Sequence, residues 1–360
     1  MIHLRALCRG CLLCVVAALV SCQGGSSRVG ASSGGDTLRF KYATLLTVVR
    51  YADHTHVTIR NPWAKGRVLR QYDISRPLRR AVVTTTGHCQ LLAWLGAGAD
   101  IAGVCDAQYI QVPRVWQGLR RGQIANCGNS MSPSIEKIVA AGADAIIVSP
   151  FENSGGYGKL EQLGIPIIEA ADYMEPSPLA RAEWMRLYGL LFGCERRADS
   201  LFHVVDSTYN RLKTLAGKLP VGRKVLCERK TGSVWYCPGG RSTIGQLIAD
   251  AHGRYVWQED RHSGSLTLSP EQVIDRAATA DLWLFAYMGA PITRSQLLDE
   301  YEGYRTLRAM GRGQVYGCNV SRCHFFEEIP FRPDYLLRDY VQLVHPGVQL
   351  GGLRYYKQVE

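Results

Sequence analysis

A long amphipathic segment lies near the middle of this 360-residue chain, between residues 195 and 219. Its apolar residues recur at intervals of three and four, which is the spacing of one helix face. They are Leu201, Phe202, Val205, Tyr209, Leu212, Leu215 and Ala216. Gly193 precedes the run, and Gly217 and Pro220 end it. A helix of this length spans about 33 Å, so it either crosses a single core or connects two lobes.

Short apolar runs alternate with helical patterns on both sides of this segment. Before it, the pattern predicts strands at 81–85, 101–104, 145–148 and 166–169, and helices at 89–95, 133–141, 159–163 and 178–191. After it, strands are predicted at 224–227, 233–236, 282–285 and 314–316, and helices at 243–251, 270–277, 294–299 and 334–344. Such alternation is typical of an α/β fold in which helices cover a parallel sheet.

Two stretches, one on each side of the central helix, have similar sequences. Residues 132–144 and 269–281 both begin with Ser-Pro, end with Ala-Asp and precede a predicted strand. A repeat of this kind indicates two similar lobes. We therefore expect an N-terminal lobe at 78–193, a linker helix at 194–219 and a C-terminal lobe at 220–360, with a ligand cleft between the lobes.

A β-rich segment at 37–77 precedes the first lobe. Apolar and β-branched runs at 38–51, 56–60 and 68–72 predict a small antiparallel addition. His54 and His56 lie in it at i, i+2 spacing, but two ligands alone rarely form a metal site. We interpret them as residues of an exposed strand or turn and assign no role to this addition.

The N-terminus carries the features of an export signal. Arg5 and Arg9 precede an apolar run at 11–20 that is too short to span a bilayer. The sequence Leu-Val-Ser-Cys at 19–22 resembles the lipobox of bacterial lipoproteins, so we expect cleavage of a signal peptide at 1–21 and lipidation of Cys22. Residues 22–36, rich in Gly and Ser, are then a flexible tether. An uncleaved anchor and an ordinary signal peptide are the alternatives.

Composition indicates a globular protein. Apolar residues make up 46% and charged residues 20% of the chain, and the formal charge is +11. The basic residues are scattered rather than gathered with aromatic residues, so we expect no nucleic-acid partner.

Twelve cysteines occur in the chain, and eight of them lie beyond Cys22. In an oxidising compartment Cys318 and Cys323, or Cys105 and Cys127, could pair, although most of the eight fit small buried apolar positions. Cys318, Cys323 and His324 have no second ligand pair of matching spacing, so we predict no zinc site.

Several segments together resemble the substrate-binding proteins of bacterial ABC transporters that take up iron chelates and vitamin B12. They are the lipobox, the run Val-Val-Thr-Thr-Thr-Gly-His at 82–88, the glycine-bounded strand at 95–104, the segments 134–148 and 163–166, the central helix, and the segments 265–271 and 280–284. The resemblance extends from about residue 78 to residue 344 and rests on the order and spacing of these pieces. It implies two Rossmann-like lobes joined by one helix.

The resemblance also implies partners and a location. Such proteins bind an iron complex (ferric siderophore or haem) or cobalamin in the periplasm and deliver it to an ABC permease and its ATPase. One glutamate on each lobe docks on the permease, and these match Glu136 and Glu271 by position. A carboxylate in the first turn of a helix is also favoured by the helix dipole alone. Lipid attachment at Cys22 would hold this protein at the bilayer.

Loop residues that follow the predicted strands are candidates for the ligand cleft. They are Thr86, His88, Gln108, Tyr109, Phe151, Tyr157, Trp235, Tyr236, Arg241 and Tyr287. Aromatic rings and an arginine suit a flat anionic or amphipathic ligand, although each residue also fits ordinary packing or a solvated loop. We expect no resident cofactor or metal, because any iron or cobalt would arrive with the ligand.

Enzyme motifs are absent from the sequence. The glycines at 96 and 98 lack the third glycine of a dinucleotide loop and follow a helix, and no Walker A, His-Glu-x-x-His or Gly-x-Ser-x-Gly motif occurs. We therefore predict a binding protein without catalytic residues. The alternatives are a zinc or manganese receptor of an ABC importer, and an exported enzyme or adhesion lipoprotein on the same fold.

Overall fold

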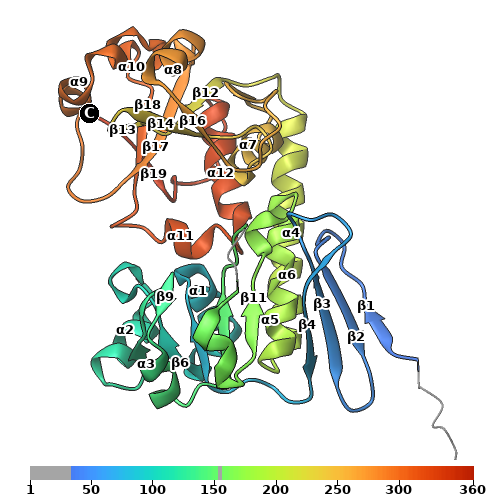
Figure 1. Cartoon of the computed structure of the whole chain (residues 1–360). Coiled ribbons are helices and arrows are strands. Elements are labelled where there is room, and N and C mark those ends of the chain that lie inside the picture. The colour runs from blue at the N-terminus through green and yellow to red at the C-terminus, as the bar shows by residue number, and fades with distance from the viewer. Residues whose placement is uncertain (1–33, 153–155) are drawn as a thin grey trace, which may run out of the picture. The chain divides into compact units, whose positions relative to one another are not determined.

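Two five-stranded sheets, each built around parallel strands, form the centres of two lobes in the computed structural model, which describes residues 34–152 and 156–360 (Figure 1). The first has the order β11-β10-β5-β6-β7, and its strands are β5 (Ala81–Val83), β6 (Ile101–Val104), β7 (Ala125–Asn126), β10 (Ala145–Val148) and β11 (Ile167–Glu169). The second has the order β15-β12-β17-β18-β19, and its strands are β12 (Lys224–Cys227), β15 (Arg254–Tyr255), β17 (Leu282–Tyr287), β18 (Val315–Asn319) and β19 (Tyr356–Gln358). The predicted α/β class with two lobes is confirmed. The antiparallel edge strand β19 was not predicted.

Helices accompany each sheet. Those of the N-terminal lobe are α1 (Thr86–Leu95), α2 (Pro113–Arg120), α3 (Ile135–Ala140), α4 (Pro178–Glu183) and α5 (Met185–Leu191). Those of the C-terminal lobe are α7 (Thr243–Asp250), α8 (Pro270–Ala277), α9 (Arg294–Glu300), α10 (Arg308–Gly311), α11 (Phe325–Glu328) and α12 (Pro333–Val344). Short 3-10 helices occupy Gly98–Asp100, Ala107–Tyr109, Gly158–Leu163, Asp172–Met174 and Glu302–Thr306.

The central helix α6 (Glu195–Gly217) follows the predicted periodicity and packs against both lobes. It contacts α5 of the N-terminal lobe and α12 of the C-terminal lobe, and Figure 1 shows it running beside both sheets. Its buried residues are Ala198, Phe202, Val205, Tyr209, Leu212 and Ala216. At its C-terminal half, the Tyr209 hydroxyl donates to Asp250 of α7 at 2.7 Å. One face of α6 is therefore buried against both lobes.

The two similar segments, 132–144 and 269–281, form similar local structures. Ser134 and Ser269 are the N-caps of α3 and α8. Asp144 accepts hydrogen bonds from the backbone N–H groups of Arg79 and Arg80 just before β5, and Asp281 accepts one from Lys224 at the start of β12. Each aspartate thus fixes the start of a neighbouring strand.

Three predicted helix boundaries were wrong. Helix α3 begins at Ile135 rather than Pro133, because Pro133 pairs with Gly128 in a short hairpin of β8 (Gly128–Asn129) and β9 (Ser132–Pro133). Helix α1 begins three residues earlier than predicted, since Thr85 caps it by accepting a hydrogen bond from the His88 N–H. The predicted helix at 178–191 is two helices that break at Trp184.

The β-rich addition is a four-stranded antiparallel sheet in sequence order. Its strands are β1 (Asp36–Leu38), β2 (Leu46–Arg50), β3 (Thr55–Arg60) and β4 (Val68–Ile74). Leu46, Val48, Val57 and Ile59 are buried. The run at 38–51, predicted as one strand, is interrupted at 39–45. A smaller antiparallel sheet of β13 (Lys230–Thr231), β14 (Val234–Pro238) and β16 (Ser265–Leu268) belongs to the C-terminal lobe.

Two carboxylates explain the interruption in the N-terminal sheet. Glu183, completely buried on α4, accepts hydrogen bonds from three consecutive backbone N–H groups, at residues 41, 42 and 43. Glu175 accepts the N–H groups of Thr44 and Leu45 at 2.9 and 3.0 Å. Five N–H donors that a strand would pair with a neighbouring strand are satisfied here by charged acceptors, which make stronger hydrogen bonds than neutral ones. The addition is therefore fastened to the N-terminal lobe by its backbone.

The predicted signal peptide, the lipidation site Cys22 and most of the tether lie outside the described residues. The tether was predicted to end at residue 36, which is the first residue of β1. Within the described ranges, no helix has the length and apolar character needed to cross a membrane.

Replacing Glu183 should lower the stability of the fold. In Glu183→Gln the amide keeps one acceptor oxygen and places an NH₂ group against backbone donors, so buried N–H groups lose their partner. We expect a loss of about 3 kcal/mol in the free energy of unfolding. Urea unfolding measures it, with Glu302→Gln, which alters an exposed side chain, as the control. Equal stability of the two variants would contradict the role given to Glu183.

Candidate functional site

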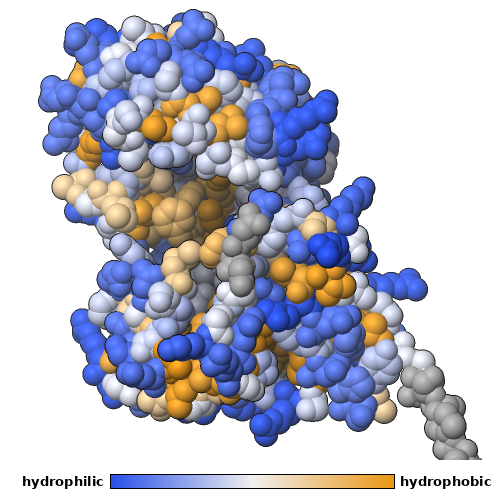
Figure 2. Space-filling view, in the orientation of Figure 1, coloured by the Kyte–Doolittle hydropathy of each residue, from blue (hydrophilic) through white to orange (hydrophobic). Residues whose placement is uncertain are grey.

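The carboxyl edges of the two sheets face each other across the molecule. In the loop after β6, the Gln111 amide donates to the Val320 carbonyl in the loop after β18 at 2.6 Å. The Thr86 hydroxyl, in the first turn of α1, donates to Glu327 of α11 at 2.9 Å. In open α/β sheets ligands bind at this edge, where strands end and helices begin. Figure 2 shows an apolar hollow in the surface between the two lobes.

Close approach of α1 and α11 depends on Gly87. A Cβ atom at this position would lie 3.1 Å from Pro330 Cγ and 3.3 Å from the Phe326 carbonyl oxygen. A Cβ atom at this position would therefore require Pro330 or Phe326 to shift by a few tenths of an ångström.

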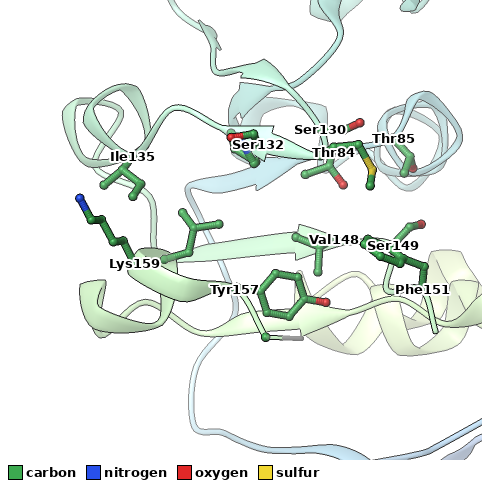
Figure 3. A pocket seen from close by; sticks show the side chains of 14 residues that line it. Thr84, Thr85, Ser130, Ser132, Ile135, Val148, Ser149, Phe151, Tyr157 and Lys159 are labelled. Carbon is green, nitrogen blue, oxygen red and sulfur yellow. The ribbon is translucent and has the colours of Figure 1, made fainter. Parts of the chain in front are cut away.

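A pocket of about 410 Å³ opens at the carboxyl edge of the first sheet (Figure 3). It lies between the ends of β5 and β10, the β8–β9 hairpin and residues 156–160. The described residues that line it are Thr84, Thr85, Ser130, Met131, Ser132, Pro133, Ile135, Val148, Ser149, Phe151, Gly156, Tyr157, Lys159 and Leu160. Apolar walls with a few convergent polar groups are typical of small-molecule sites.

The pocket combines an apolar rim with hydroxyl groups and one cation. Met131 and Phe151 are 69% and 46% exposed, so both present apolar surface at the rim of the pocket. Figure 3 places Lys159 and Ile135 at one end of the pocket and Phe151 at the other. This lining suits an organic molecule with both apolar and oxygen-rich parts.

The four-stranded sheet β1–β4 supports this pocket through Glu169, which lies at the end of β11 in the first lobe. Arg70 of β4 donates to one carboxylate oxygen of Glu169 at 2.9 Å, and the Tyr157 hydroxyl donates to the other at 2.8 Å. Burial and the neighbouring Glu169 raise the pKa of Tyr157, so its phenol stays neutral. The ring of Tyr157 is thereby held in the pocket wall.

Two of the ten candidate ligand residues are inside the protein. His88 is 3% exposed, its Nε2–H donates to the Asp172 carboxylate at 3.0 Å, its Nδ1 lies 2.6 Å from the Thr85 hydroxyl, and its ring stacks on Tyr188. Burial alone would raise the pKa of Asp172, but His88 and Arg181 hold it below its ordinary value. His88 is therefore part of a buried polar network and cannot face an open cleft.

Trp235 was also expected in the cleft and is fully buried. Its indole N–H donates to the Cys227 carbonyl at 3.3 Å, and its ring packs against Trp283 and Tyr304. Both burials depend on partners distant in sequence, which the pattern around each residue did not indicate.

Of the other eight candidates, two line the pocket and six lie elsewhere in the two lobes. Phe151 and Tyr157 line it, and Thr86 adjoins Thr85. Gln108 and Tyr109 are exposed in the loop that contains Gln111. On the C-terminal lobe, Tyr287 ends β17 half-buried, Tyr236 is exposed on β14, and Arg241 is exposed before α7. Among the described residues, no hydrogen bond or ion pair joins Tyr236 or Arg241 to the residues that line the pocket.

The sequence did not indicate the β8–β9 hairpin as part of the site. Ser130 and Ser132 lie in it, and its position depends on Asp106, which has a left-handed backbone (φ 47°) after β6. The Asp106 carboxylate accepts the Ser130 N–H at 3.1 Å. Non-glycine residues in this conformation are uncommon and cluster at functional sites. In the sequence, a local pattern of turn residues was the only signal for this hairpin.

Glu228 also has a left-handed backbone and lies at the carboxyl end of β12 in the second sheet. It follows β12 with a φ of 63°, and its carboxylate accepts the Ala286 N–H at 3.3 Å. Burial raises the pKa of Glu228 to about 7, against an ordinary value of 4.5. The carboxyl edge of the second sheet therefore contains an acid that titrates near neutrality.

The predicted docking glutamates are both accessible. Glu136 and Glu271 occupy the second position of α3 and α8, two residues after the capping serines, and both are exposed. Its own backbone N–H and the Ser269 hydroxyl lower the pKa of Glu271. Neither carboxylate has an ion-pair partner among the residues that the structure describes.

Glu228 should make stability depend on pH. Its folded pKa is raised, so its contribution is fully present below pH 4.5 and is lost as the pH rises through 7. Relative to Glu228→Gln, the wild type should lose about 3 kcal/mol in the free energy of unfolding between pH 4.5 and 8. Urea unfolding at both pH values measures this difference, and parallel pH profiles of the two proteins would refute it.

Comparisons with known proteins agree with this geometry. The sequence matches the periplasmic binding protein family over residues 82–320. Two uncharacterized lipoproteins of Methanocaldococcus jannaschii are 24% and 23% identical, over 79% and 69% of this chain and 69% and 65% of their own.

Solved structures with the same fold include three binding proteins. They are an Fe3+-hydroxamate transport protein of Saccharomonospora viridis (17% identity, TM-score 0.59, 79% of this chain and 98% of that one), a periplasmic heme binding protein of Pseudomonas aeruginosa (17%, 0.60, 78% and 98%) and a periplasmic vitamin B12 binding protein of Vibrio cholerae (14%, 0.56, 74% and 96%). At these identities the likeness describes the fold alone. The family match covers most of the chain, and the chain therefore belongs to the periplasmic binding protein family.

Proposed function

We propose that this protein captures an iron complex (ferric siderophore or haem) or cobalamin and delivers it to an ABC importer. The observation that carries the proposal is the pocket at the carboxyl edge of the first sheet, with its exposed apolar rim and convergent hydroxyl groups. Three structural neighbours are an Fe3+-hydroxamate transport protein, a heme binding protein and a vitamin B12 binding protein; these ligands are large organic metal complexes and support the same class. The metal is cargo that enters with its chelator.

The proposed ligand contacts come from both lobes. On the N-terminal lobe, Phe151 and Tyr157 offer ring surfaces, and Ser130, Ser149 and Lys159 offer polar groups. On the C-terminal lobe we assign Tyr287, together with Glu228. Thr86, Gln108 and Tyr109 lie beside the first set, and Tyr236 and Arg241 remain candidates for the rim. Binding of this kind needs complementary surface and no catalytic group, so we propose a receptor rather than an enzyme.

Delivery requires the protein to stay at the membrane. We propose lipid attachment through Cys22 in the periplasm, which the lipoprotein relatives support. The exposed carboxylates of Glu136 and Glu271 are proposed to pair with cations of the permease, one on each lobe. The helix α6 and the direct contacts from Gln111 and Thr86 favour small changes in lobe separation when ligand binds.

Filling the pocket should abolish ligand binding. Ser149 is exposed and lines the pocket, so Ser149→Trp occupies it without disturbing the core. We expect a loss of affinity of at least 100-fold for the ligand that the wild type binds. Titration with haem, ferric hydroxamate and catecholate siderophores and cobalamin, followed by tryptophan fluorescence, measures it.

Ser207→Trp on the exposed face of α6 is the matched control and should bind as the wild type does. Tight binding by Ser149→Trp would remove the pocket from the site. No binding of any of these compounds by the wild type, or recovery of a chemically altered ligand, would contradict the proposed function.

Charge reversal of the docking residues should separate delivery from binding. In Glu136→Arg and Glu271→Arg an attractive contact with the permease becomes repulsive, so uptake of labelled ligand by cells should fall at least tenfold. Ligand affinity of the purified variants should not change, because both residues lie outside the pocket. Glu302→Arg provides a control for charge alone. Uptake as high as in that control would argue against docking at these positions.

A further inference from the structure

We propose that Cys318 and Cys323 are a redox-active pair that closes to a disulfide by exchange with a low-molecular-weight disulfide outside the cytoplasm. Their sulfur atoms are 3.5 Å apart. Cys318 lies in β18 and is completely buried, whereas Cys323 is partly exposed just before α11. The Cys323 thiol is thus reachable from solvent, whereas the Cys318 thiol is buried next to it.

The turn between the two cysteines holds them in this position. The Asn319 carbonyl accepts the N–H of Arg322 at 2.9 Å and lies 3.3 Å from the Cys323 sulfur. The Asn319 side chain accepts the Ser321 N–H at 3.1 Å and donates to the Gly289 carbonyl at 2.9 Å. A disulfide bond is about 2.0 Å long, so closure requires a small movement of side chains within a turn that is already formed.

The chemistry needs only a disulfide as oxidant. The Cys323 thiol loses its proton, and the thiolate attacks an external disulfide RSSR, forming a mixed disulfide and releasing RS⁻. Cys318 then loses its proton and attacks the Cys323 sulfur, which expels the second RS⁻. The two released thiolates take up the two protons, so the protein gives up two electrons and RSSR becomes two RSH. A hydrogen bond with Cys318 lowers the pKa of Cys323, which favours the first attack.

Closure would act on the contacts between the lobes. The six-residue ring from Cys318 to Cys323 contains Val320, whose carbonyl accepts the Gln111 amide of the N-terminal lobe. The segment that follows carries Glu327, the acceptor of the Thr86 hydroxyl. The oxidised form therefore fixes the piece of chain that makes both contacts, whichever ligand the protein binds.

Mass spectrometry tests the pair directly. The purified protein is incubated with oxidised glutathione, denatured, alkylated with iodoacetamide and digested with trypsin, which cuts after Arg312, Arg322 and Arg338. We expect peptides 313–322 and 323–338 to be joined by a disulfide that reductant separates. The remaining described cysteines, most of them buried, should be alkylated. Alkylation of both Cys318 and Cys323 after this treatment, or their linkage to other cysteines, would overturn the proposal.

Two variants sharpen the result. Cys318→Ser should stop the reaction at a glutathione adduct on Cys323, whereas Cys105→Ser, a buried cysteine elsewhere, should still form the 318–323 linkage. Hydrogen exchange of the oxidised and reduced wild type then measures the coupling. Amides in 320–328 should exchange at least threefold more slowly in the oxidised form. Equal exchange in the two forms would refute the effect on the contacts between the lobes.

Discussion

The apolar face of α6 is buried on two sides at once, and the arrangement of the molecule follows from that sharing. Gly189 of α5 has no room for a Cβ atom against Ala198, so α5 lies very close to the N-terminal half of α6. The C-terminal half of the same face packs on α12, and the Tyr209 hydroxyl reaches Asp250. Because neither lobe can release this face without exposing apolar surface to water, the two sheets keep their carboxyl edges turned toward each other.

Elements with a complete local signal could be predicted from the sequence. Helices α6 and α8, and strands β6, β10 and β12, have regular apolar patterns with clear ends, and their observed bounds lie within a residue or two of the predicted ones. Strand β19 lacks such a pattern, since Tyr356–Gln358 is short and is defined by pairing with β18. The three threonines at 84–86 have β-branched side chains that favour a strand, yet Thr85 caps a helix. There the hydrogen bond of a cap outweighed intrinsic preference.

The candidate site was harder to predict because its members are selected by distant partners. His88 was predicted as a cleft residue, but its side chain is hydrogen-bonded inside the protein to Asp172, 84 positions away. Ser130 becomes a pocket residue through Asp106, whose left-handed backbone no periodicity announces. Tyr157 was predicted, but the reason for its orientation is Arg70 on a sheet to which the sequence assigned no role. Residue type and loop position can nominate candidates, and burial and long-range hydrogen bonds decide among them.

The hydrogen bonds from the backbone of residues 41–45 to Glu183 and Glu175 also determine how mechanical load enters the protein. Any pull exerted on the chain from the N-terminal side reaches the folded body through β1 and then meets five N–H groups held by Glu183 and Glu175. The Tyr42 hydroxyl adds a bond to Asp206 of α6 at 2.6 Å. Tension is thus passed through Glu183 to α4 and through Tyr42 to the central helix.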